Sequence, residues 1–297
     1  MIQIKYFIWR WYCEIIMYRI TLTYDDEMIK DKAYYSNLIL ERFKEQEEQL
    51  KECWNNCDPT ITKYFYIDDL LPTKDAEEIY NEYLKKTDKW VVSKSLFERK
   101  STLKEIDILG SVIPSITDSF HSEEVVNVIS NITGINELEP DPSLYAGGMS
   151  RMTKGDFLSP HIDNSHDQPK LRYRRLNLLY YVSPDWVSEN GGNLELWDKK
   201  VTTPFEIVSA FNRLVVMRTN DSSYHSVNKV KVDQPRCCVS NYYFSENSEK
   251  GYDYHHVTSA GAWPGQHFLR ALGSVHTAAR TLISIVTGKT RKGIVRY

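Results

Sequence analysis

The sequence predicts a mainly β fold with flanking helices, an α+β arrangement around an antiparallel sandwich or barrel. Between residues 144 and 244, short apolar runs alternate with turn residues at the regular spacing typical of antiparallel domains. Aromatic residues make up 12% of the chain, including 20 Tyr and 7 Trp, and such side chains are common in strands. The segments before and after this region show helical periodicity instead.

The region before residue 143 is predicted to be largely helical. In Asp26–Asn55, apolar residues recur at helical spacing among many Glu and Lys, and Asp58-Pro59 ends the pattern. A strand-like run follows at Ile61–Leu71. The further helices expected here are Lys74–Lys86 with Thr73 as N-cap, a weaker one at Ile106–Ser119, and Ser122–Ile132 between a Ser122 cap and a Gly134 stop.

Short strands are expected from Ser143 onward, and a helix after them. The runs are Leu144–Thr153, Arg175–Val182, Gly192–Trp197, Thr203–Ile207, Arg213–Arg218, His225–Val232 and Cys237–Phe244. Pro264–Thr287 is expected to form one amphipathic helix with an apolar stripe of Phe268, Leu272, Val275, Ala279, Leu282 and Val286. This molecule, a second copy or a lipid surface must cover such a stripe, and we expect one of the first two.

Composition and charge exclude several classes of protein. Hydrophobic residues make up 41% and charged residues 26%, a normal globular balance. The net charge of −3 gives no nucleic-acid footprint, although seven Lys/Arg stand against two acidic residues from Glu249 onward. Charged residues interrupt the apolar N-terminus, so neither a signal peptide nor a membrane span is expected there. The five cysteines have no framework spacing, which favours free thiols and a cytoplasmic location.

His161-Ile-Asp163 is the first candidate for a metal site. Residues i and i+2 of an extended chain point to the same side, so one imidazole and one carboxylate can hold one ion. The pattern alone is weak, because a chain with eight His and 40 acidic residues is expected to contain such a match by chance, and His121-Ser-Glu123 is one. The candidate therefore needs support from residues elsewhere in the chain.

Two downstream residues supply that support. His225 begins a predicted strand, and Arg236 opens a later one. Two His and one carboxylate on one face of Fe(II) leave three positions open, which a 2-oxo acid and dioxygen can fill. An Arg fork on a neighbouring strand suits the distal carboxylate of such an acid. Arg151, Arg175 and Asn177 are further pocket candidates, and strand alternation places Arg175 and Asn177 on one side.

From about Ile61 to Phe244 the chain resembles the prolyl-4-hydroxylase-like branch of the 2-oxoglutarate/Fe(II)-dependent dioxygenases. The matching segments include GDFLSPHIDN, RRLNLLYYVSPDW, NGGNLELWD, YHSV and PRCCVSNYYF. The resemblance implies a double-stranded β-helix (jelly-roll or cupin-like) core, iron on His161, Asp163 and His225, and Arg236 on 2-oxoglutarate. Family members often carry Ser where this chain has Cys238, so Cys238 is the candidate helper at the same carboxylate. Related halogenases have Gly or Ala at position 163, so Asp163 favours hydroxylation.

We expect the chain to have three parts and one type of reaction. The parts are an N-terminal helical extension (1–58), a dioxygenase domain (59–248) and a basic C-terminal helical extension (249–297). We expect Fe(II), 2-oxoglutarate and O2 as reactants, with ascorbate as a candidate reductant, and a small-molecule substrate that is oxidised as succinate and CO2 are released. The alternatives are a peptidyl-prolyl hydroxylase and a non-catalytic metal- or ligand-binding protein. A homodimer and a membrane-surface contact of the C-terminal helix stay open.

Overall fold

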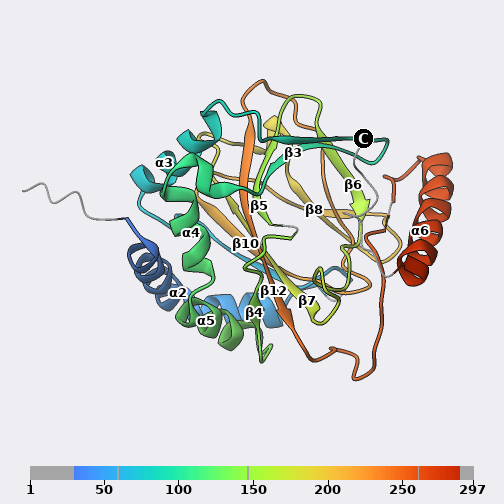
Figure 1. Ribbon diagram of the computed structural model, residues 1–297, viewed down its shortest axis with the longest axis horizontal. Helices are drawn as coiled ribbons and strands as arrows, with labels where there is room; N and C mark the ends of the chain where they lie inside the picture. Colours follow the sequence, from blue (N-terminus) through green and yellow to red (C-terminus); the bar gives the residue numbers. More distant parts are fainter. Residues whose placement is uncertain (1–29, 59, 146, 260, 288–297) are drawn as a thin grey trace, which may run out of the picture. The chain divides into compact units, whose positions relative to one another are not determined.

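The computed structural model describes residues 30–287 except 59, 146 and 260. The described residues from Asp31 onward form one compact unit, and residues 26–29 of the first expected helix lie outside the described residues. No helix within the described ranges is long and apolar enough to cross a membrane. The described chain consists of one large antiparallel sheet and the helices packed around it (Figure 1).

Four helices precede most of the sheet, and local capping explains where they begin. They are α2 (Lys32–Asn55), α3 (Thr73–Leu84), α4 (Val112–Phe120) and α5 (Glu123–Thr133). Asp31 caps α2 by accepting a hydrogen bond from the Tyr34 amide at 3.0 Å, and Ser122 caps α5 in the same way through the Val125 amide. Gly134 ends α5 in the left-handed region, with a φ of 66°. The Ser122 and Gly134 predictions are confirmed.

These helices cover one face of the sheet and share a core with it. Tyr35, Ile39 and Phe43 of α2 are fully buried and belong to the same apolar cluster as residues of α3, α4, α5 and six strands of the sheet. Figure 1 shows α2, α4 and α5 side by side on that face. The helix that was expected to belong to an N-terminal extension is therefore part of the main core.

The sheet is a curled antiparallel half-barrel, as expected for a double-stranded β-helix. Its strands run in the order β1-β10-β7-β12-β5-β3-β6-β11-β8-β9, with β2 beside β3 and β4 beside β12. The bounds are β1 (Tyr64–Ile67), β2 (Val91–Lys94), β3 (Glu98–Leu103), β4 (Glu139–Pro140), β5 (Gly148–Met152), β6 (Phe157–His161), β7 (Tyr173–Tyr181), β8 (Leu194–Trp197), β9 (Pro204–Ile207), β10 (Arg213–Arg218), β11 (His225–Val227) and β12 (Arg236–Ser245).

Several predicted elements differ from the observed ones for local reasons. The helix expected at Ile106–Ser119 is broken at Gly110, whose φ of 108° is incompatible with a continuing helix, so a short 3-10 turn (Ile106–Leu109) precedes α4. Thr73 is the first residue of α3 and not its cap, because Pro72 occupies the N-cap position. The run expected to reach Val232 ends at Val227, where β11 turns away from β6.

The last helix, α6 (His267–Thr287), attaches by its polar side to the segment that precedes it and to the loop between β8 and β9. Arg270 donates to the carbonyls of Ala262 and Val201, and Arg280 donates to that of Thr258. The part of the predicted apolar stripe from Phe268 to Leu282 faces outward instead, since Phe268 is 79% and Val275 is 68% exposed. We expected this molecule or a second copy to cover the stripe, and the described residues of this molecule do not. A second copy stays a prediction.

Candidate metal centre

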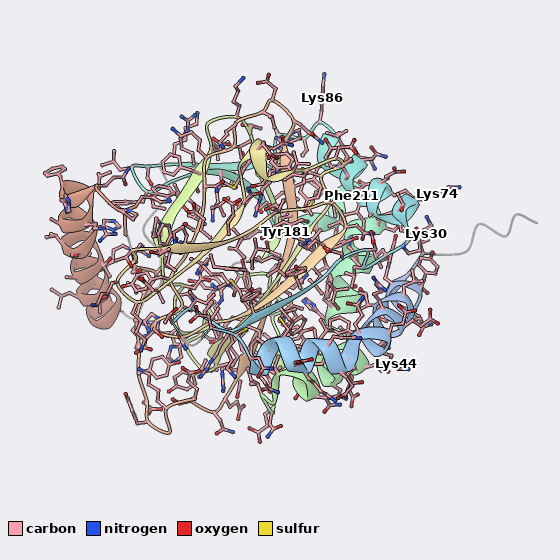
Figure 2. The ribbon with its side chains drawn as sticks, turned by 180° about the vertical axis from the view of Figure 1, so that it is seen from behind. Lys30, Lys44, Lys74, Lys86, Tyr181 and Phe211 are labelled. Atoms are coloured by element: carbon pink, nitrogen blue, oxygen red, sulfur yellow. The ribbon has the colours of Figure 1, made fainter. Side chains whose placement is uncertain are left out.

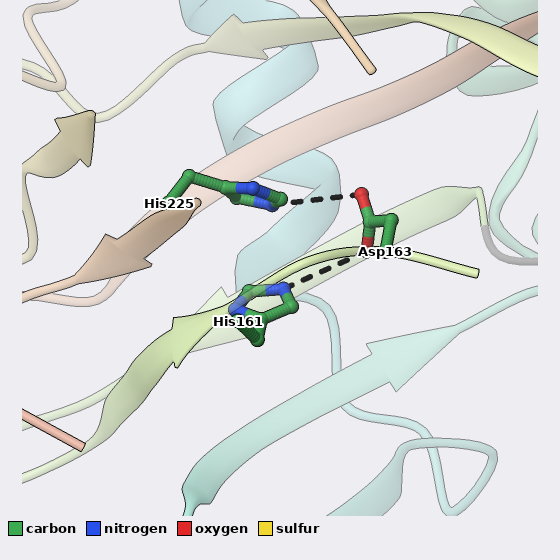
Figure 3. Close-up of side chains that lie close together, drawn as sticks. All are labelled: His161, Asp163 and His225. Carbon is green, nitrogen blue, oxygen red and sulfur yellow. Dashed lines mark ion pairs between the residues drawn. The ribbon is translucent and has the colours of Figure 1, made fainter. Parts of the chain in front are cut away.

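Three side chains from two neighbouring strands converge on one point. His161 ends β6 and His225 begins β11, and the antiparallel register makes them direct cross-strand partners. Their rings lie 4.2 Å apart, and Asp163 follows β6 so that its carboxylate reaches both (Figure 3). His161 Nε2 lies 3.6 Å from Asp163 Oδ1, and His225 Nε2 lies 3.5 Å from Oδ2. One potential ligand atom from each residue falls within 4.8 Å of the others.

Both imidazoles are oriented in the same way, by a hydrogen bond to the backbone carbonyl two residues earlier in the chain. His161 Nδ1 lies 2.9 Å from the Ser159 carbonyl, and His225 Nδ1 lies 2.9 Å from the Ser223 carbonyl. A carbonyl oxygen can only accept, so each Nδ1 carries the proton and each neutral Nε2 presents a lone pair toward Asp163. Burial lowers the pKa of His225 to about 4, which keeps this ring neutral at pH 7. The tautomers are those that a metal ion requires.

Asp163 is held as a carboxylate chiefly by the neighbouring Arg174. Burial opposes its ionisation, but the Arg174 guanidinium, ahead of the adjacent histidines, holds the pKa of this carboxyl well below the ordinary value. Arg174 Nη2 lies 3.2 Å from Oδ2, and Asn177 Nδ2 donates to the same oxygen at 2.9 Å. Two neutral imidazoles and one carboxylate on one face form the donor set typical of non-haem Fe(II) sites, so the residues fit that ion.

A buried arginine on β12 provides the second part of the site. Arg236 is 4% exposed and lies over the ring of Tyr181, with its guanidinium carbon 4.6 Å from the ring centroid. Its Nε donates to the Gly192 carbonyl at 2.9 Å and to Ser209 Oγ at 3.2 Å. Within the described ranges no carboxylate pairs with Arg236, which leaves a buried cation suited to the carboxylate of a ligand.

The arginine and the triad share one face of the sheet. In the register of β12 with β7, Cys238 pairs with Tyr181, and Tyr242 pairs with Asn177. Alternation along β12 therefore places Arg236, Cys238 and Tyr242 on the concave face, where Asn177 contacts Asp163. Tyr181 lies among the interior side chains, while Lys44 and Lys74 point outward from their helices (Figure 2). The structure thus brings Arg236, Cys238 and Asn177 to the side of the metal ligands.

Two predicted pocket residues are not brought to the metal ligands. Arg151 donates to the Tyr83 carbonyl and stacks on Trp90, and it pairs across the sheet with Cys237, on the opposite face from Cys238. Arg175 donates to the Asn247 carbonyl at 3.0 Å, away from Asp163. Both therefore lie outside the group formed by the triad, Asn177 and Arg236.

Arg174 lies in the site although the sequence analysis selected its neighbour. Strand alternation placed Arg175 with Asn177, but the partner of β12 shifts from Leu176 to Arg174 between Tyr243 and Phe244. This irregularity leaves Arg175 unpaired in the ladder and puts Arg174 and Asn177 on the same face. A β-bulge cannot be recognised from the alternation of residues along a strand, so the sequence offered no reason to prefer Arg174 over Arg175. Ser209 and Tyr181, the neighbours of Arg236, were also missed.

A C-terminal segment lies along the loop that carries Asp163. The Ser259 amide donates to the Ile162 carbonyl, and Ser259 Oγ accepts from the Ile162 amide at 2.8 Å. The Ser165 amide donates to the His256 carbonyl at 3.0 Å. Residues 256–259 therefore satisfy the backbone on either side of Asp163 and fix the loop in place.

The other His-x-acid match lies in a different environment. His121 follows α4, and its Nε2 lies 3.1 Å from Asn241 Oδ1. Glu123 begins α5, where acidic side chains stabilise a helix N-terminus. Among the described residues, His161, Asp163 and His225 form the group of three potential metal ligands whose ligand atoms lie close together, and His121 and Glu123 do not belong to it.

The strand-rich region matches a known protein family. Residues 147–244, which hold all three metal ligands and Arg236, match the 2OG-Fe(II) oxygenase superfamily. No curated protein sequence matches the chain. The family and the triad together indicate Fe(II) and 2-oxoglutarate as cofactor and co-substrate.

Solved structures with a similar fold include several prolyl hydroxylases. One from Trichoplax adhaerens, in complex with a peptide fragment of a hypoxia inducible factor, is 17% identical with a TM-score of 0.51, covering 69% of this chain and 92% of that one. A prolyl 4-hydroxylase from Phytophthora capsici is 17% identical with a TM-score of 0.50, covering 84% and 77%. A Pseudomonas putida prolyl-4-hydroxylase is 10% identical with a TM-score of 0.50, covering 67% and 98%. At these identities the likeness shows a shared fold.

Proposed function

We propose that this chain, whose residues 147–244 match the 2OG-Fe(II) oxygenase superfamily, hydroxylates a C–H bond of a small metabolite and releases succinate and CO2. The observation that carries the reaction class is the convergence of His161, Asp163 and His225, with Arg236 buried on the same concave face. When bound, Fe(II) together with 2-oxoglutarate supplies the oxidising power for this reaction.

The residues of the chain position the reactants. His161 Nε2, His225 Nε2 and an oxygen of Asp163 would hold the metal on one side and leave the opposite side open. The Arg236 guanidinium would bind the distal carboxylate of 2-oxoglutarate, since Tyr181 and Ser209 hold the guanidinium in place in a dehydrated setting. The carboxylate of Asp163 occupies the ligand position that a halogenase would leave for chloride, which supports hydroxylation.

The backbone beside the metal ligands supports a small substrate over a peptide. An extended peptide binds a sheet edge by pairing with free amides and carbonyls. Here Ile162 and Ser165 already bond to residues 256–259, so this edge beside Asp163 offers a peptide little to pair with. A compact substrate that enters over the open face of the metal needs no such edge.

A succinate-release screen tests the proposal directly. Purified protein with Fe(II), 2-oxoglutarate and oxygen is incubated with pooled metabolites in one arm and pooled proline-containing peptides in the other, and His225→Ala serves as the inactive control. We expect succinate above background in the metabolite arm alone. Succinate in the peptide arm alone would replace the proposal with a peptidyl-prolyl hydroxylase. Equal background for wild type and control in both arms would contradict turnover of either class.

A further inference from the structure

The two oxygens of the Asp163 carboxylate have different surroundings. Oδ2 accepts from Asn177 Nδ2 at 2.9 Å and faces Arg174 Nη2 at 3.2 Å. Oδ2 thus accepts one hydrogen bond and lies beside a cation, and it also lies 3.5 Å from His225 Nε2. Oδ1 lies 3.6 Å from His161 Nε2, and no Arg or Asn side chain within the described ranges donates to it. Oδ1 therefore keeps more of its lone-pair capacity for a metal than Oδ2 does.

Arg174 is fixed by contacts on every side of its guanidinium. Its Nε donates to Asn177 Oδ1 at 2.8 Å, and its Nη1 lies 3.4 Å from Asn164 Oδ1. The ring of Tyr242 lies beneath it, with the guanidinium carbon 3.6 Å from the centroid. Because Asn177 Oδ1 accepts from Arg174, its Nδ2 must turn toward Asp163, so one residue sets the orientation of the other. Arg174 itself is 3% exposed, which keeps water from competing for these bonds.

We propose that Arg174 and Asn177 are positioning residues that make Asp163 bind the metal through Oδ1 alone. A carboxylate that bound through both oxygens would fill one of the positions that 2-oxoglutarate and dioxygen need. The proposal rests on the metal site assigned above. It also explains why a cation lies so near a metal site: the charge of Arg174 opposes metal binding but holds the second oxygen away from the ion.

Adjacent residues provide a matched set of variants. Arg174→Gln removes the cation from Oδ2, and Asn177→Leu removes the neutral donor without changing the size of the side chain greatly. Arg175→Gln is the control, because Arg175 neighbours Arg174 on β7 but donates to the Asn247 carbonyl. Arg174→Lys keeps a charge that can reach Oδ2 but cannot hold Asn177 and Asn164 together.

The readouts are binding and spectroscopy, without turnover. Each variant is titrated anaerobically with Co²⁺ and then with 2-oxoglutarate by calorimetry, and the visible spectrum of the Co²⁺ form reports its coordination number. For Arg174→Gln and Asn177→Leu we expect Co²⁺ affinity within about fivefold of wild type, 2-oxoglutarate affinity lowered about tenfold or more, and a spectrum of higher coordination number. Arg174→Lys should recover part of the loss, and Arg175→Gln should match wild type.

Three results would overturn the assignment. Wild-type 2-oxoglutarate affinity and spectrum in both variants would show that Oδ2 needs no such restraint. Loss of Co²⁺ binding in both variants would show that the pair holds Asp163 in place and does not select its oxygen. An equal effect of Arg175→Gln would point to a general disturbance of β7. Should Arg174→Gln fail to fold, Asn177→Leu decides alone. A wild-type protein that binds Co²⁺ but never 2-oxoglutarate would instead contradict the proposed function.

Discussion

Arg236 Nε donates to the backbone carbonyl of Gly192 at 2.9 Å. This bond uses Nε, so the two terminal nitrogens of the guanidinium remain on the concave side of the sheet. There, Nη1 lies 4.0 Å from Met152 Sδ. The loop that contains Gly192 therefore aims the fork of Arg236. The arrangement explains why a turn without catalytic side chains belongs to the functional site.

Arg236→Lys is expected to weaken 2-oxoglutarate binding to the metal-loaded protein by about 10- to 100-fold. An ammonium group cannot form two parallel bonds to a carboxylate, and one charge-assisted hydrogen bond contributes about 1.5–3 kcal/mol. Anaerobic calorimetry measures the affinity. Arg213→Lys is the control. Arg213, on β10, forms a two-bond ion pair with Asp68, so its substitution should leave the 2-oxoglutarate affinity unchanged. Equal affinities for wild type and Arg236→Lys would remove Arg236 from the pocket.

Gly191→Ala is expected to destabilise the protein by about 3 kcal/mol or more. An added Cβ would lie 2.1 Å from the Lys229 carbonyl oxygen, and the φ of 66° already disfavours a side chain. Gly155→Ala is the matched comparison, because its φ is 87° but no atom lies within 4 Å of the added Cβ. It should cost only about 1–2 kcal/mol. Urea denaturation measures both, and equal losses would show that the Lys229 contact is unimportant.

Two truncations separate the roles of the C-terminal parts. A chain ending at Gln266 loses α6 but keeps the bonds of residues 256–259 to Ile162 and Ser165, so its metal affinity should stay close to that of the full chain. A chain ending at Glu249 loses those bonds, and both its melting temperature and metal affinity should fall. Thermal melts and metal titrations of the two chains give the comparison. Indistinguishable behaviour of the shorter chain and the full chain would contradict the role assigned to residues 256–259.

The stability of the metal-free protein should decrease as the pH falls from about 6.5 toward 4. Burial, together with the charge of nearby His255, lowers the pKa of His166 to about 4. An unfolded imidazole has a pKa of about 6.5, so between these values the unfolded state binds a proton that the native state does not. His166→Asn should flatten the curve by up to about 1.4 kcal/mol per pH unit. Denaturant titrations across this range measure the slopes, and parallel curves would rule out His166.

Much of the fold could be predicted because periodicity matches burial. Tyr35, Ile39 and Phe43 lie at helical spacing and are fully buried in α2, and β10 has the bounds that its apolar run predicts. The hairpin of β2 and β3 was missed, because Val91 and Val92 are exposed and β3 is mostly polar. Strand β3 nevertheless joins β5 to β6 and so connects the two halves of the sheet. Its position depends on pairing partners and not on its own pattern.

The metal ligands could be predicted because their spacing is local. His161 and Asp163 face one ion through chain geometry alone, and His225 opens a recognisable strand. Arg174 could not be predicted, because a bulge reverses the alternation that selected Arg175. The exposed stripe of α6 shows the same limit, since spacing identified the apolar residues but not the side of the helix that packs. Residue contacts across the sheet decided both cases.

Anaerobic titration with Fe(II) tests the central claim most directly. Wild-type protein should bind one ion, and only the loaded protein should then bind 2-oxoglutarate. His161→Ala, Asp163→Ala and His225→Ala should each lower Fe(II) affinity by more than the roughly 10- to 100-fold that loss of a supporting residue causes. His121→Ala, in the other His-x-acid match, should bind as wild type does. Fe(II) affinity that is unchanged in all three ligand variants would contradict the assigned site.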